Sequence, residues 1–540
     1  MKRRGNFWMV TALVLGLLTL GTGLPAYAQD PVVEEIPPGP ETSLPDYVGA
    51  PAKAHPLANS RVPQDPFLAP NPFSHVHSDA CNSDTTDIAG PLGRDPEVLS
   101  SALLQARRDP TSQVFTAPTR AFDKHGRPVM VCLGPGEASL VVADAESLEA
   151  LSWFPLPPPA NTITGLSAGY FYIDNLDQTH VVSGTHTIIT LREGGSDTKP
   201  VLEPVGEYDL SAIVQDDRIG GMMPDWQGRI WFDTAGEGLA PAKVCVLNPA
   251  AYPDVKCVPL DQGKQIRNTF ALTKAGVDRS AAYIVTSRQM YRIDAGPDDN
   301  PYVVWSEPYN TSYEKIGGEG KPRPGQYEAG SGTSPTILGN GKYVAITDNA
   351  IHMNVVVFRT DERLRPNEQR KVCEVEVFAP EGAKDEDVYG ALSNSLVGSG
   401  LSLIAENNYG YSFNLGTQEM TPSLPGFERI DIDANGKGCH KVWTNDEVAS
   451  IVSPHLSTKT GLIYTVARKM DESKTDAQHP YGLDVYYWTA LDFRTGEVVW
   501  EKMAGTGWRF DGWYLGLGIG PTGTMYVGGY GGLMSIRDTR

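Results

Sequence analysis

The sequence predicts an all-β protein built as a single β-propeller, with eight blades favoured over seven. Three observations lead to this fold. A strand–turn–strand unit at residues 490–500 recurs in looser copies along the chain, and two further short strands precede each copy. The mature chain has no helical periodicity longer than about three turns, and its best helical candidate is residues 96–107. A four-stranded unit repeated every 45–75 residues or so is typical of a propeller.

The unit at 490–500 has a clear physical logic. Asp492 and Thr495 can bond the turn backbone, and Gly496 suits the position that needs a positive φ. We expect Trp500 to bury its ring between neighbouring sheets. Copies that keep the tryptophan run over 143–153, 293–305 and 432–443; copies without it run over 244–258, 355–375 and 187–191; residues 534–538 form a truncated last copy.

A small-residue strand and then a stronger strand come before each hairpin, and residues 334–338 are an example of the first kind. Strands of the second kind are expected at 229–233, 282–286, 343–348, 401–406, 462–466 and 524–529. Four strands per unit with glycine-containing turns make one blade.

Several of these segments resemble the repeat of PQQ-type quinoprotein β-propellers. They are Ser334-Pro335-Thr336, Met525-Tyr526-Val527-Gly528, and Ala490-Leu491-Asp492 with Thr495, Gly496 and Trp500. The units at 451–500 and 515–538 match well, and the others are degenerate. The resemblance implies a propeller, but the family includes quinoprotein alcohol dehydrogenases as well as non-enzymatic scaffolds, one of them an outer-membrane assembly factor. It therefore says little about function.

The N-terminus predicts export. Lys2, Arg3 and Arg4 precede an apolar run, and Ala26-Tyr27-Ala28 fits a cleavage site, so residues 1–28 are expected to be a signal peptide. A membrane anchor is the alternative. We expect a Pro-rich tail or linker at 29–114, a propeller at 115–540, and a secreted or periplasmic protein. No other segment approaches 18 apolar residues, so no membrane span is expected in the mature chain.

The charge narrows the choice of partners. Losing the three cations of the signal peptide changes the formal net charge from −20 to −23 (−20 minus 3). Such a surface repels nucleic acid and anionic membranes. We expect a small molecule or a protein partner at the propeller face, and no nucleic acid.

The six cysteines are Cys81, Cys132, Cys245, Cys257, Cys373 and Cys439. An even count in an exported protein favours disulfides. Cys245–Cys257 is the favoured pair because both residues fall on one hairpin; Cys81–Cys132 would then tie down the tail and Cys373–Cys439 would remain. Quinoprotein alcohol dehydrogenases typically carry a ring of adjacent cysteines, and this sequence has no adjacent pair.

Each of two motifs is compatible with a metal-binding site or with a loop that binds no metal. His75-Val76-His77 places two imidazoles on one side of an extended strand, which suits a transition metal, but a solvated loop is more common in a Pro-rich tail. Residues 431–436 match the start of an EF-hand loop. The twelfth position is Val442 instead of glutamate, so a hairpin turn is favoured.

A candidate metal site follows from propeller geometry. Residues before the first strand and after the second strand of each blade converge on one face of the ring. Carboxylates and carboxamides gather at these points: Asp348, Asn349, Asn394, Glu406 and Asn407. Their oxygens are the type that Ca²⁺ takes. The alternative is that these side chains only cap turns through local bonds.

Three functions stay open. The first is an exported ligand- or partner-binding propeller with a calcium-type site in its funnel. The second is an oxidoreductase that uses PQQ and calcium, as the resemblance implies. The third is a calcium-dependent lactonase or esterase of the gluconolactonase kind, in which the metal polarises a carbonyl and His455 could act as a base.

Overall fold

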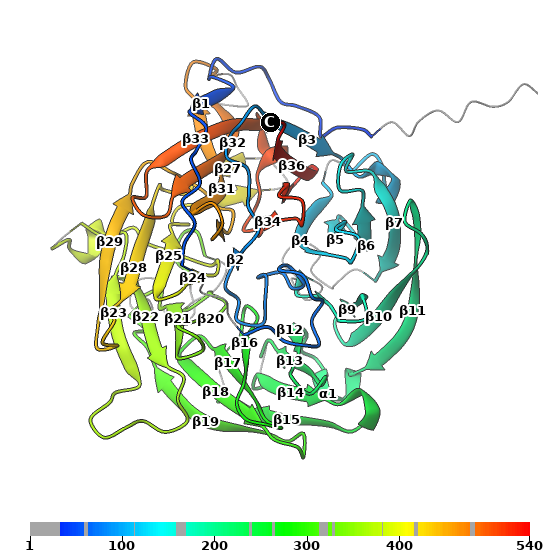
Figure 1. The fold of residues 1–540 in the computed structure, drawn as a ribbon, viewed down its shortest axis with the longest axis vertical. Helices are drawn as coiled ribbons and strands as arrows, with labels where there is room; N and C mark the ends of the chain where they lie inside the picture. Colours follow the sequence, from blue (N-terminus) through cyan, green and yellow to red (C-terminus); the bar gives the residue numbers. More distant parts are fainter. Residues whose placement is uncertain are drawn as a thin grey trace, which may run out of the picture. The chain divides into compact units, whose positions relative to one another are not determined.

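The computed structural model describes residues 33–58, 63–112, 114–157, 169–236, 240–261, 265–312, 322–326, 330–380, 382–414, 419–475 and 481–540. The expected signal peptide at 1–28 lies outside the described residues. From Val33 to Arg540 the chain forms one compact unit. Its strands form eight sheets arranged as blades around a central axis, which confirms the predicted propeller with eight blades (Figure 1).

The first four blades contain the following strands, each named from the axis outward. Blade 1 has β4 (Thr116–Phe122), β5 (Pro128–Gly134), β6 (Glu137–Ala143) and β7 (Ala150–Leu156). Blade 2 has β8 (Tyr172–Ile173), β9 (Gln178–Ser183), β10 (Thr187–Ser196) and β11 (Lys199–Asp209). Blade 3 has β12 (Ile219–Pro224), β13 (Ile230–Thr234), β14 (Lys243–Leu247) and β15 (Val255–Pro259). Blade 4 has β16 (Ala271–Lys274), β17 (Ser280–Val285), β18 (Gln289–Ala295) and β19 (Pro301–Pro308).

The last four blades follow the same order. Blade 5 has β20 (Thr336–Leu338), β21 (Tyr343–Thr347), β22 (Asn354–Arg359) and β23 (Lys371–Glu376). Blade 6 has β24 (Val397–Ser399), β25 (Ser402–Glu406), β28 (Phe427–Ile432) and β29 (Cys439–Asn445), with the hairpin β26 (Ser412–Asn414) and β27 (Glu419–Thr421) inserted. Blade 7 has β30 (His455–Ser457), β31 (Leu462–Asp471), β32 (Leu483–Asp492) and β33 (Val498–Thr506). Blade 8 has β34 (Gly518–Ile519), β35 (Met525–Gly529) and β36 (Gly532–Asp538).

The N-terminal part of the chain completes two of these sheets. The strand β3 (Pro96–Ser101) pairs antiparallel with β36 and supplies the outer strand of blade 8, so the two ends of the chain close the ring together. The strand β1 (Tyr47–Gly49) extends the outer edge of blade 7, and β2 (Thr85–Thr86) pairs parallel with its inner strand β30. The truncated last copy of the repeat therefore obtains its fourth strand from the other end of the sequence.

Helical structure is confined to single turns in the described residues: α1 (Ser211–Val214), η1 (Leu104–Ala106), η3 (Pro249–Ala251), η4 (Asp385–Asp387) and η5 (Trp508–Phe510). The helical candidate at 96–107 is wrong, because this segment forms β3 and then the turn η1. Hydrogen bonds to β36 decide its conformation, and local periodicity cannot register a partner more than 400 residues away.

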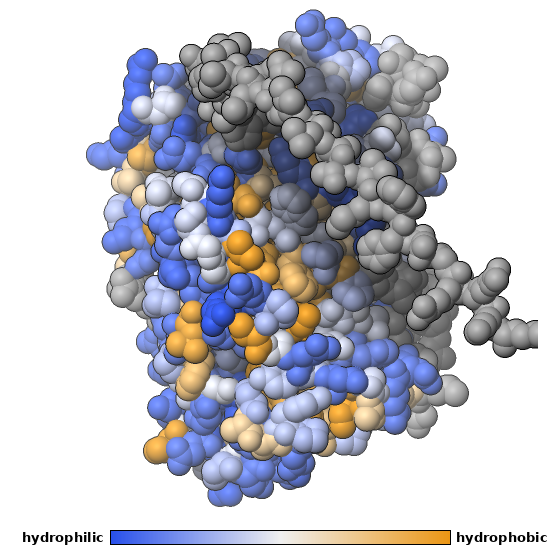
Figure 2. All heavy atoms as spheres, turned by 90° about the vertical axis from the view of Figure 1, so that its right-hand side faces the viewer, coloured by the Kyte–Doolittle hydropathy of each residue, from blue (hydrophilic) through white to orange (hydrophobic). Residues whose placement is uncertain are grey.

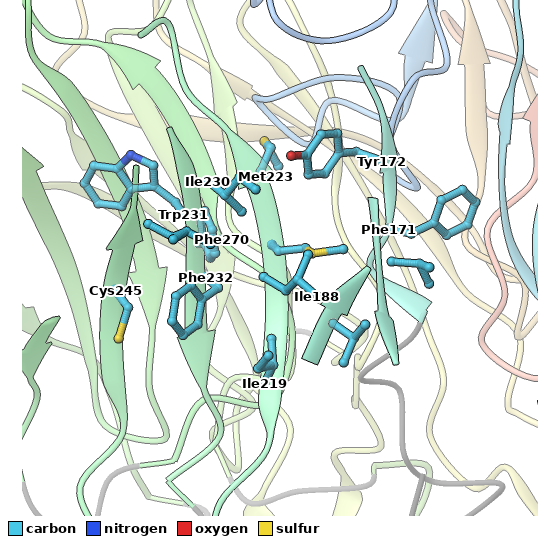
Figure 3. Close-up of a cluster of buried hydrophobic side chains, with 14 of the residues drawn as sticks. Phe171, Tyr172, Ile188, Ile219, Met223, Ile230, Trp231, Phe232, Cys245 and Phe270 are labelled. Carbon is cyan, nitrogen blue, oxygen red and sulfur yellow. The ribbon is translucent and has the colours of Figure 1, made fainter. Parts of the chain in front are cut away.

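The core lies between neighbouring sheets, where each blade packs against the next. Between blades 2, 3 and 4, apolar side chains from inner and middle strands interdigitate (Figure 3). Trp231 on β13 is fully buried there, and its indole N–H donates to Asp225 at 2.7 Å. Strands buried on both faces read as apolar runs, which is why the second strands were visible in the sequence.

The tryptophan pattern is confirmed for one copy and fails for another. Trp500 is fully buried, as predicted. Trp153, in the matching place on β7, is 45% exposed. On the side of the molecule that includes β7 and β11, apolar side chains are scattered among polar ones (Figure 2). Val201 and Val205 on β11 are exposed on this side as well.

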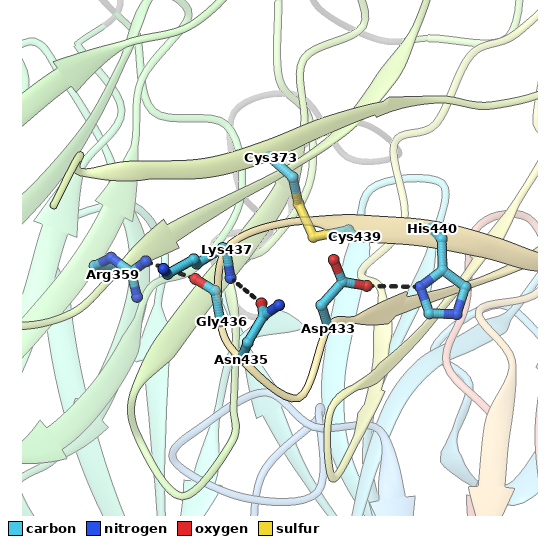
Figure 4. The surroundings of a disulfide bond; sticks show 8 residues. All are labelled: Arg359, Cys373, Asp433, Asn435, Gly436, Lys437, Cys439 and His440. Atoms are coloured by element: carbon cyan, nitrogen blue, oxygen red, sulfur yellow. Dashed lines mark hydrogen bonds and ion pairs between the residues drawn. A yellow bond between two sulfur atoms is a disulfide. The ribbon is translucent and has the colours of Figure 1, made fainter.

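The cysteines form two disulfides. Cys245 and Cys257 face each other in register on β14 and β15, which confirms the favoured pair. Cys373 on β23 is bonded to Cys439 on β29, so this bridge links blade 5 to blade 6 (Figure 4). All six cysteines are in described residues, and Cys81 and Cys132 are buried free thiols. The Cys81–Cys132 pairing is therefore wrong; Cys81 packs against blades 4 and 5, whereas Cys132 is in the middle of blade 1.

The EF-hand-like segment is a hairpin turn between β28 and β29. The backbone N–H of Asp433 donates to the carbonyl of Gly438, and that of Gly436 donates back to Asp433. Gly436 has a φ of +65°, the left-handed conformation that glycine adopts at low cost. The Asp433 carboxylate bonds His440 at 2.8 Å, and Arg359 of blade 5 donates to the carbonyl of Gly436 (Figure 4). The turn interpretation is confirmed.

Candidate functional site

A segment of the N-terminal region, residues 73–86, passes through the centre of the ring (Figure 1), and we call it the axial segment. Its carbonyls accept hydrogen bonds of 2.7–3.0 Å from the inner strands of six blades. The pairs are Phe73 with Phe122, Ser74 with Ile173, Ala80 with Leu272, Cys81 with Ile337, Ser83 with Gly398, and Asp84 with Leu456. All residues from Phe73 to Asp84 are buried. The segment thus fills the axis with a hydrogen-bonded polar chain.

The buried position of this segment contradicts the expectation that the His-x-His motif lies in a solvated loop. His75 and His77 are both buried, and their rings lie 6.1 Å apart. Burial and the neighbouring His77 hold the pKa of His75 well below its ordinary value. The Pro-rich composition predicted an irregular tail, but the region contains the short strands β1, β2 and β3, and composition carries no information about what the segment packs against.

His77 is the centre of a network that joins the axial segment to two blades. Its Nδ1 lies 3.1 Å from an Asp84 carboxylate oxygen. Its Nε2 lies 3.1 Å from the Oγ of Ser334, just before β20. Ser395, just before β24, places its Oγ 3.2 Å from His77 Nδ1 and also donates to Asp84. The imidazole is therefore fixed by groups that come from three regions of the sequence.

A second polar chain joins blades 2, 4 and 6 beside this network. The hydroxyl of Tyr170, just before β8, donates to Asn268 Oδ1 at 2.7 Å. Asn268, just before β16, donates through Nδ2 to the carbonyl of Ser393 at 3.1 Å. The rings of Tyr170 and His77 lie 6.0 Å apart. Residues that precede inner strands thus converge on one level of the axis, as propeller geometry predicts.

Two of the five predicted site residues meet in this region. Asn394 Nδ2 donates to Glu406 Oε1, and Asn408 Nδ2 donates to the same oxygen at 3.0 Å. Within the described part of the chain, Glu406 Oε2 has no hydrogen-bond partner. Burial raises the pKa of Glu406 to about 8. We call the residues of this level the axial cluster: His77, Asp84, Tyr170, Asn268, Ser334, Ser393, Asn394, Ser395 and Glu406.

The other three predicted residues use their oxygens in hydrogen bonds within the protein, and only those of Asp348 are confined to a local turn. The Asp348 carboxylate accepts three bonds of 2.8–3.0 Å, from Ala350 N and from Asn354 N and Nδ2. Burial raises the pKa of Asp348 to about 7. Asn349 and Asn407 accept backbone N–H groups through their amide oxygens.

The carboxamide and carboxylate oxygens of these five residues are thus not all directed to one point. Over the described residues, no three His, Cys, Asp or Glu side chains are grouped so as to hold a metal ion. The calcium site at Asp348, Asn349, Asn394, Glu406 and Asn407 stays a prediction.

Several buried polar atoms near the same face lack partners in the described structure. They include Glu406 Oε2, Ser393 Oγ, Thr269 Oγ1 and Asp233 Oδ1. Thr269 precedes β16, and Asp233 is near the end of the second strand β13. Burial raises the pKa of Asp233 to about 8, although the N–H of Gly221 donates to its other oxygen at 3.0 Å. An unpaired buried polar group costs about 1–3 kcal/mol, so these atoms mark where a ligand would be stabilised.

A separate pocket of about 490 Å³ is lined in part by the axial segment. Its lining includes residues at or beyond the carboxyl ends of inner strands, such as Asn175 and Thr458, and the loop that contains Asp65 and Asn71. Burial raises the pKa of Asp65 to about 7 and that of Asp79, which also lines the pocket, to about 6.

Sequence reasoning found Asn394 and Glu406 but missed the residues that connect them to the axis. The available signal was the polar run between Ser74 and Thr86, which contains two histidines, two aspartates and an asparagine in a stretch without turn-forming glycine. Its role is visible only when the ring closes around it.

Comparisons with known proteins give no function. No family model matches the chain. It is 23% identical over 457 residues to an uncharacterised protein of Archaeoglobus fulgidus, which covers 81% of this chain and 82% of that protein.

Among solved structures, a quinohemoprotein alcohol dehydrogenase of Pseudomonas putida has a TM-score of 0.48 and 10% identity, with 87% of this chain and 80% of that chain covered. A periplasmic gluconolactonase of Pseudomonas aeruginosa has a TM-score of 0.34 and 12% identity, with 62% and 95% covered. A streptogramin B lyase has a TM-score of 0.36 and 10% identity, with 79% and 94% covered. The protein is a β-propeller module, and these likenesses extend no further than the fold.

Within the described part of the chain, no helix is long and apolar enough to cross a lipid bilayer. The two disulfides are typical of an oxidising compartment.

Proposed function

We propose that the protein is an exported binding module that holds a small polar ligand, rich in hydroxyl groups, at the axial cluster. The observation that carries this proposal is the buried and unpartnered oxygen Oε2 of Glu406, which lies beside the networks of His77 and Asn394. A ligand hydroxyl would satisfy this oxygen, because it can accept the proton of the neutral carboxyl group or donate to the carboxylate. Without a ligand, the free-energy cost of desolvating this buried oxygen is not offset by a hydrogen bond.

Export is the second part of the proposal. It is supported by the apolar N-terminal sequence with its small-residue cleavage pattern, and by the two disulfides. Mass spectrometry of protein taken from its native compartment would find Gln29 as the first residue if the proposal is right.

Ligand binding is tested by thermal shift and calorimetry with a panel of polyols, small ammonium compounds and Ca²⁺. We expect a ligand that raises the melting temperature of the wild type and loses at least ten-fold in affinity in Glu406→Gln. Asp348→Asn is the matched control: Asp348 is a buried carboxylate at the same face, but its oxygens are already used in its own turn. Equal losses in both variants would contradict the proposal.

Calcium is one outcome of the same experiment. A cation that binds only the folded protein stabilises it by about 2.7 kcal/mol at one hundred times its Kd. A chelator would then lower the melting temperature of the wild type, with much less effect on a Glu406→Gln, Asp348→Asn double variant. A melting curve that is indifferent to chelator and to added Ca²⁺ would assign the site to an organic ligand.

The two enzymatic alternatives have less support. A quinone stacked on the axis at the level of the inner strands does not fit, because the buried axial segment occupies that space with its own backbone. A metal-dependent lactonase needs several ligands around one ion, and the carboxamides of Asn349 and Asn407 are engaged elsewhere. A lactone panel with and without chelator tests the latter directly.

A further inference from the structure

Three side chains of the axial cluster have the geometry of a nucleophile, a base and a group that orients the base. The Oγ of Ser334 lies 3.1 Å from Nε2 of His77, and Nδ1 of His77 lies 3.1 Å from Asp84 Oδ2. A carboxylate can only accept a hydrogen bond, so the proton of the neutral imidazole resides on Nδ1. Nε2 then presents its lone pair to the Ser334 hydroxyl, which is the arrangement that activates a serine.

The surroundings hold this arrangement in place. Ser395 donates to Asp84 and keeps the carboxylate directed at His77. The backbone carbonyl of Asp84 accepts from Leu456, and the carbonyl of Ser83, the residue before it, accepts from Gly398, so blades 6 and 7 fix this part of the axial segment. Base and orienting group come from the axial segment, while the hydroxyl comes from blade 5. None of these contacts depends on the unpartnered oxygen of Glu406.

We infer that Ser334 is an activated nucleophile for acyl transfer, with His77 as general base and Asp84 as the residue that positions it. In the first step Ser334 Oγ bonds to the carbonyl carbon of an ester, and its proton passes to His77 Nε2. His77 then protonates the departing alkoxide, which leaves as an alcohol. Water, deprotonated by the same nitrogen, cleaves the acyl–serine bond and restores the hydroxyl.

The exposure of the cluster limits the substrate to small esters. Ser334 is 1% exposed, whereas His77 and Tyr170 keep 7% and 8% of their surfaces in contact with solvent. Because so little of the cluster is in contact with solvent, a compact acyl group is the class of substrate that it favours. Acyl transfer is an activity beyond ligand binding, and it can be tested without knowing the ligand.

The test is covalent labelling of the full-length folded protein with diisopropyl fluorophosphate. The Oγ–P bond would form as the P–F bond breaks, with fluoride leaving and the hydroxyl proton passing to His77. Peptide mass spectrometry locates the adduct, and we expect it on the peptide that contains Ser334. Ser334→Ala should abolish this adduct, and His77→Gln should slow labelling by about 10²–10⁴-fold, the usual contribution of a general base.

The control is Ser457→Ala. Ser457 is an equally buried serine at an inner strand, and its hydroxyl donates to the carbonyl of Ile88, away from His77. Its substitution should leave labelling unchanged. Circular dichroism and the melting temperature establish that each variant is folded.

If His77→Gln does not fold, the pH dependence of wild-type labelling replaces it, since the rate should rise as the imidazole loses its proton. Absence of an adduct on Ser334 in folded wild type would overturn the inference, as would labelling that is independent of pH. Because Glu406→Gln takes no part in this experiment, ligand binding and the reactive serine can fail separately.

Discussion

Replacing Glu406 by glutamine should change how the stability of the protein depends on pH. The side chain is fully buried, and burial raises its pKa from 4.5 to about 8. Between these two values the unfolded chain releases the proton while the folded protein keeps it. The native state then binds more protons than the unfolded state, so the free energy of unfolding falls as the pH rises through this window.

The size of the effect follows from the shift. Each pH unit within the window costs up to about 1.4 kcal/mol, and 3.5 units correspond to about 5 kcal/mol at most. Glutamine keeps the shape and the acceptor oxygen that Asn394 and Asn408 use, but it cannot ionise. The variant should therefore match the wild type near pH 4.5 and exceed it in stability at pH 8.

Urea unfolding at pH 5, 6, 7 and 8 measures this difference as a shift in the midpoint. Glu497→Gln is the control, because Glu497 is exposed in the turn between β32 and β33, and its curve should run parallel to that of the wild type. Parallel curves for wild type and Glu406→Gln over the whole range would refute the reasoning. Glu406 would then not be held protonated in the fold.

Three further substitutions test the architecture. Trp500→Ala should lower the free energy of unfolding by about 3–5 kcal/mol, because it removes buried apolar surface and leaves a cavity. Trp153→Ala, at a position that is 45% exposed, should lower it by less than about 1 kcal/mol. Equal shifts of the melting temperature in the two variants would contradict the role of Trp500 as an anchor between blades. Replacing Cys373 and Cys439 together by serine should lower the free energy of unfolding by up to about 4 kcal/mol, from chain entropy for a separation of 66 residues, and this should appear as a lower urea midpoint. Asn82→Ala should lower the free energy of unfolding by about 1–3 kcal/mol, because the Asn82 amide donates to carbonyls next to the inner strands of blades 4 and 5. An unchanged urea midpoint would mean that the axial segment does not stabilise the fold.

The parts of the fold that follow from short-range pattern were predictable. The apolar second strands, the Thr495–Gly496 turn and the burial of Trp500 depend on residues near each other in the sequence. The Cys245–Cys257 disulfide belongs to the same class, because its two residues face each other on a hairpin. The extent to which Trp153 is buried was not predictable in this way. Its hairpin forms as predicted, but the repeat does not reveal how far the adjacent blade covers the outer strand.

For the candidate site, the sequence determined only part of the answer. Propeller geometry correctly placed Asn394 and Glu406 on the face where blades converge. It could not assign the hydrogen bonds of Asp348, Asn349 and Asn407, because a carboxylate that binds an ion and one that caps a turn occupy the same sequence position.

By itself the sequence determined the class of the fold, because a repeated amphipathic unit must stack against copies of itself to bury its apolar faces. Only the tertiary structure decided the role of the N-terminal region. Its strand β3 closes blade 8, and its polar residues 73–86 fill the axis. His77 meets Ser334 across 257 residues. No local periodicity encodes such a contact, since the segment's hydrogen-bonding groups find partners only after eight blades have closed into a ring.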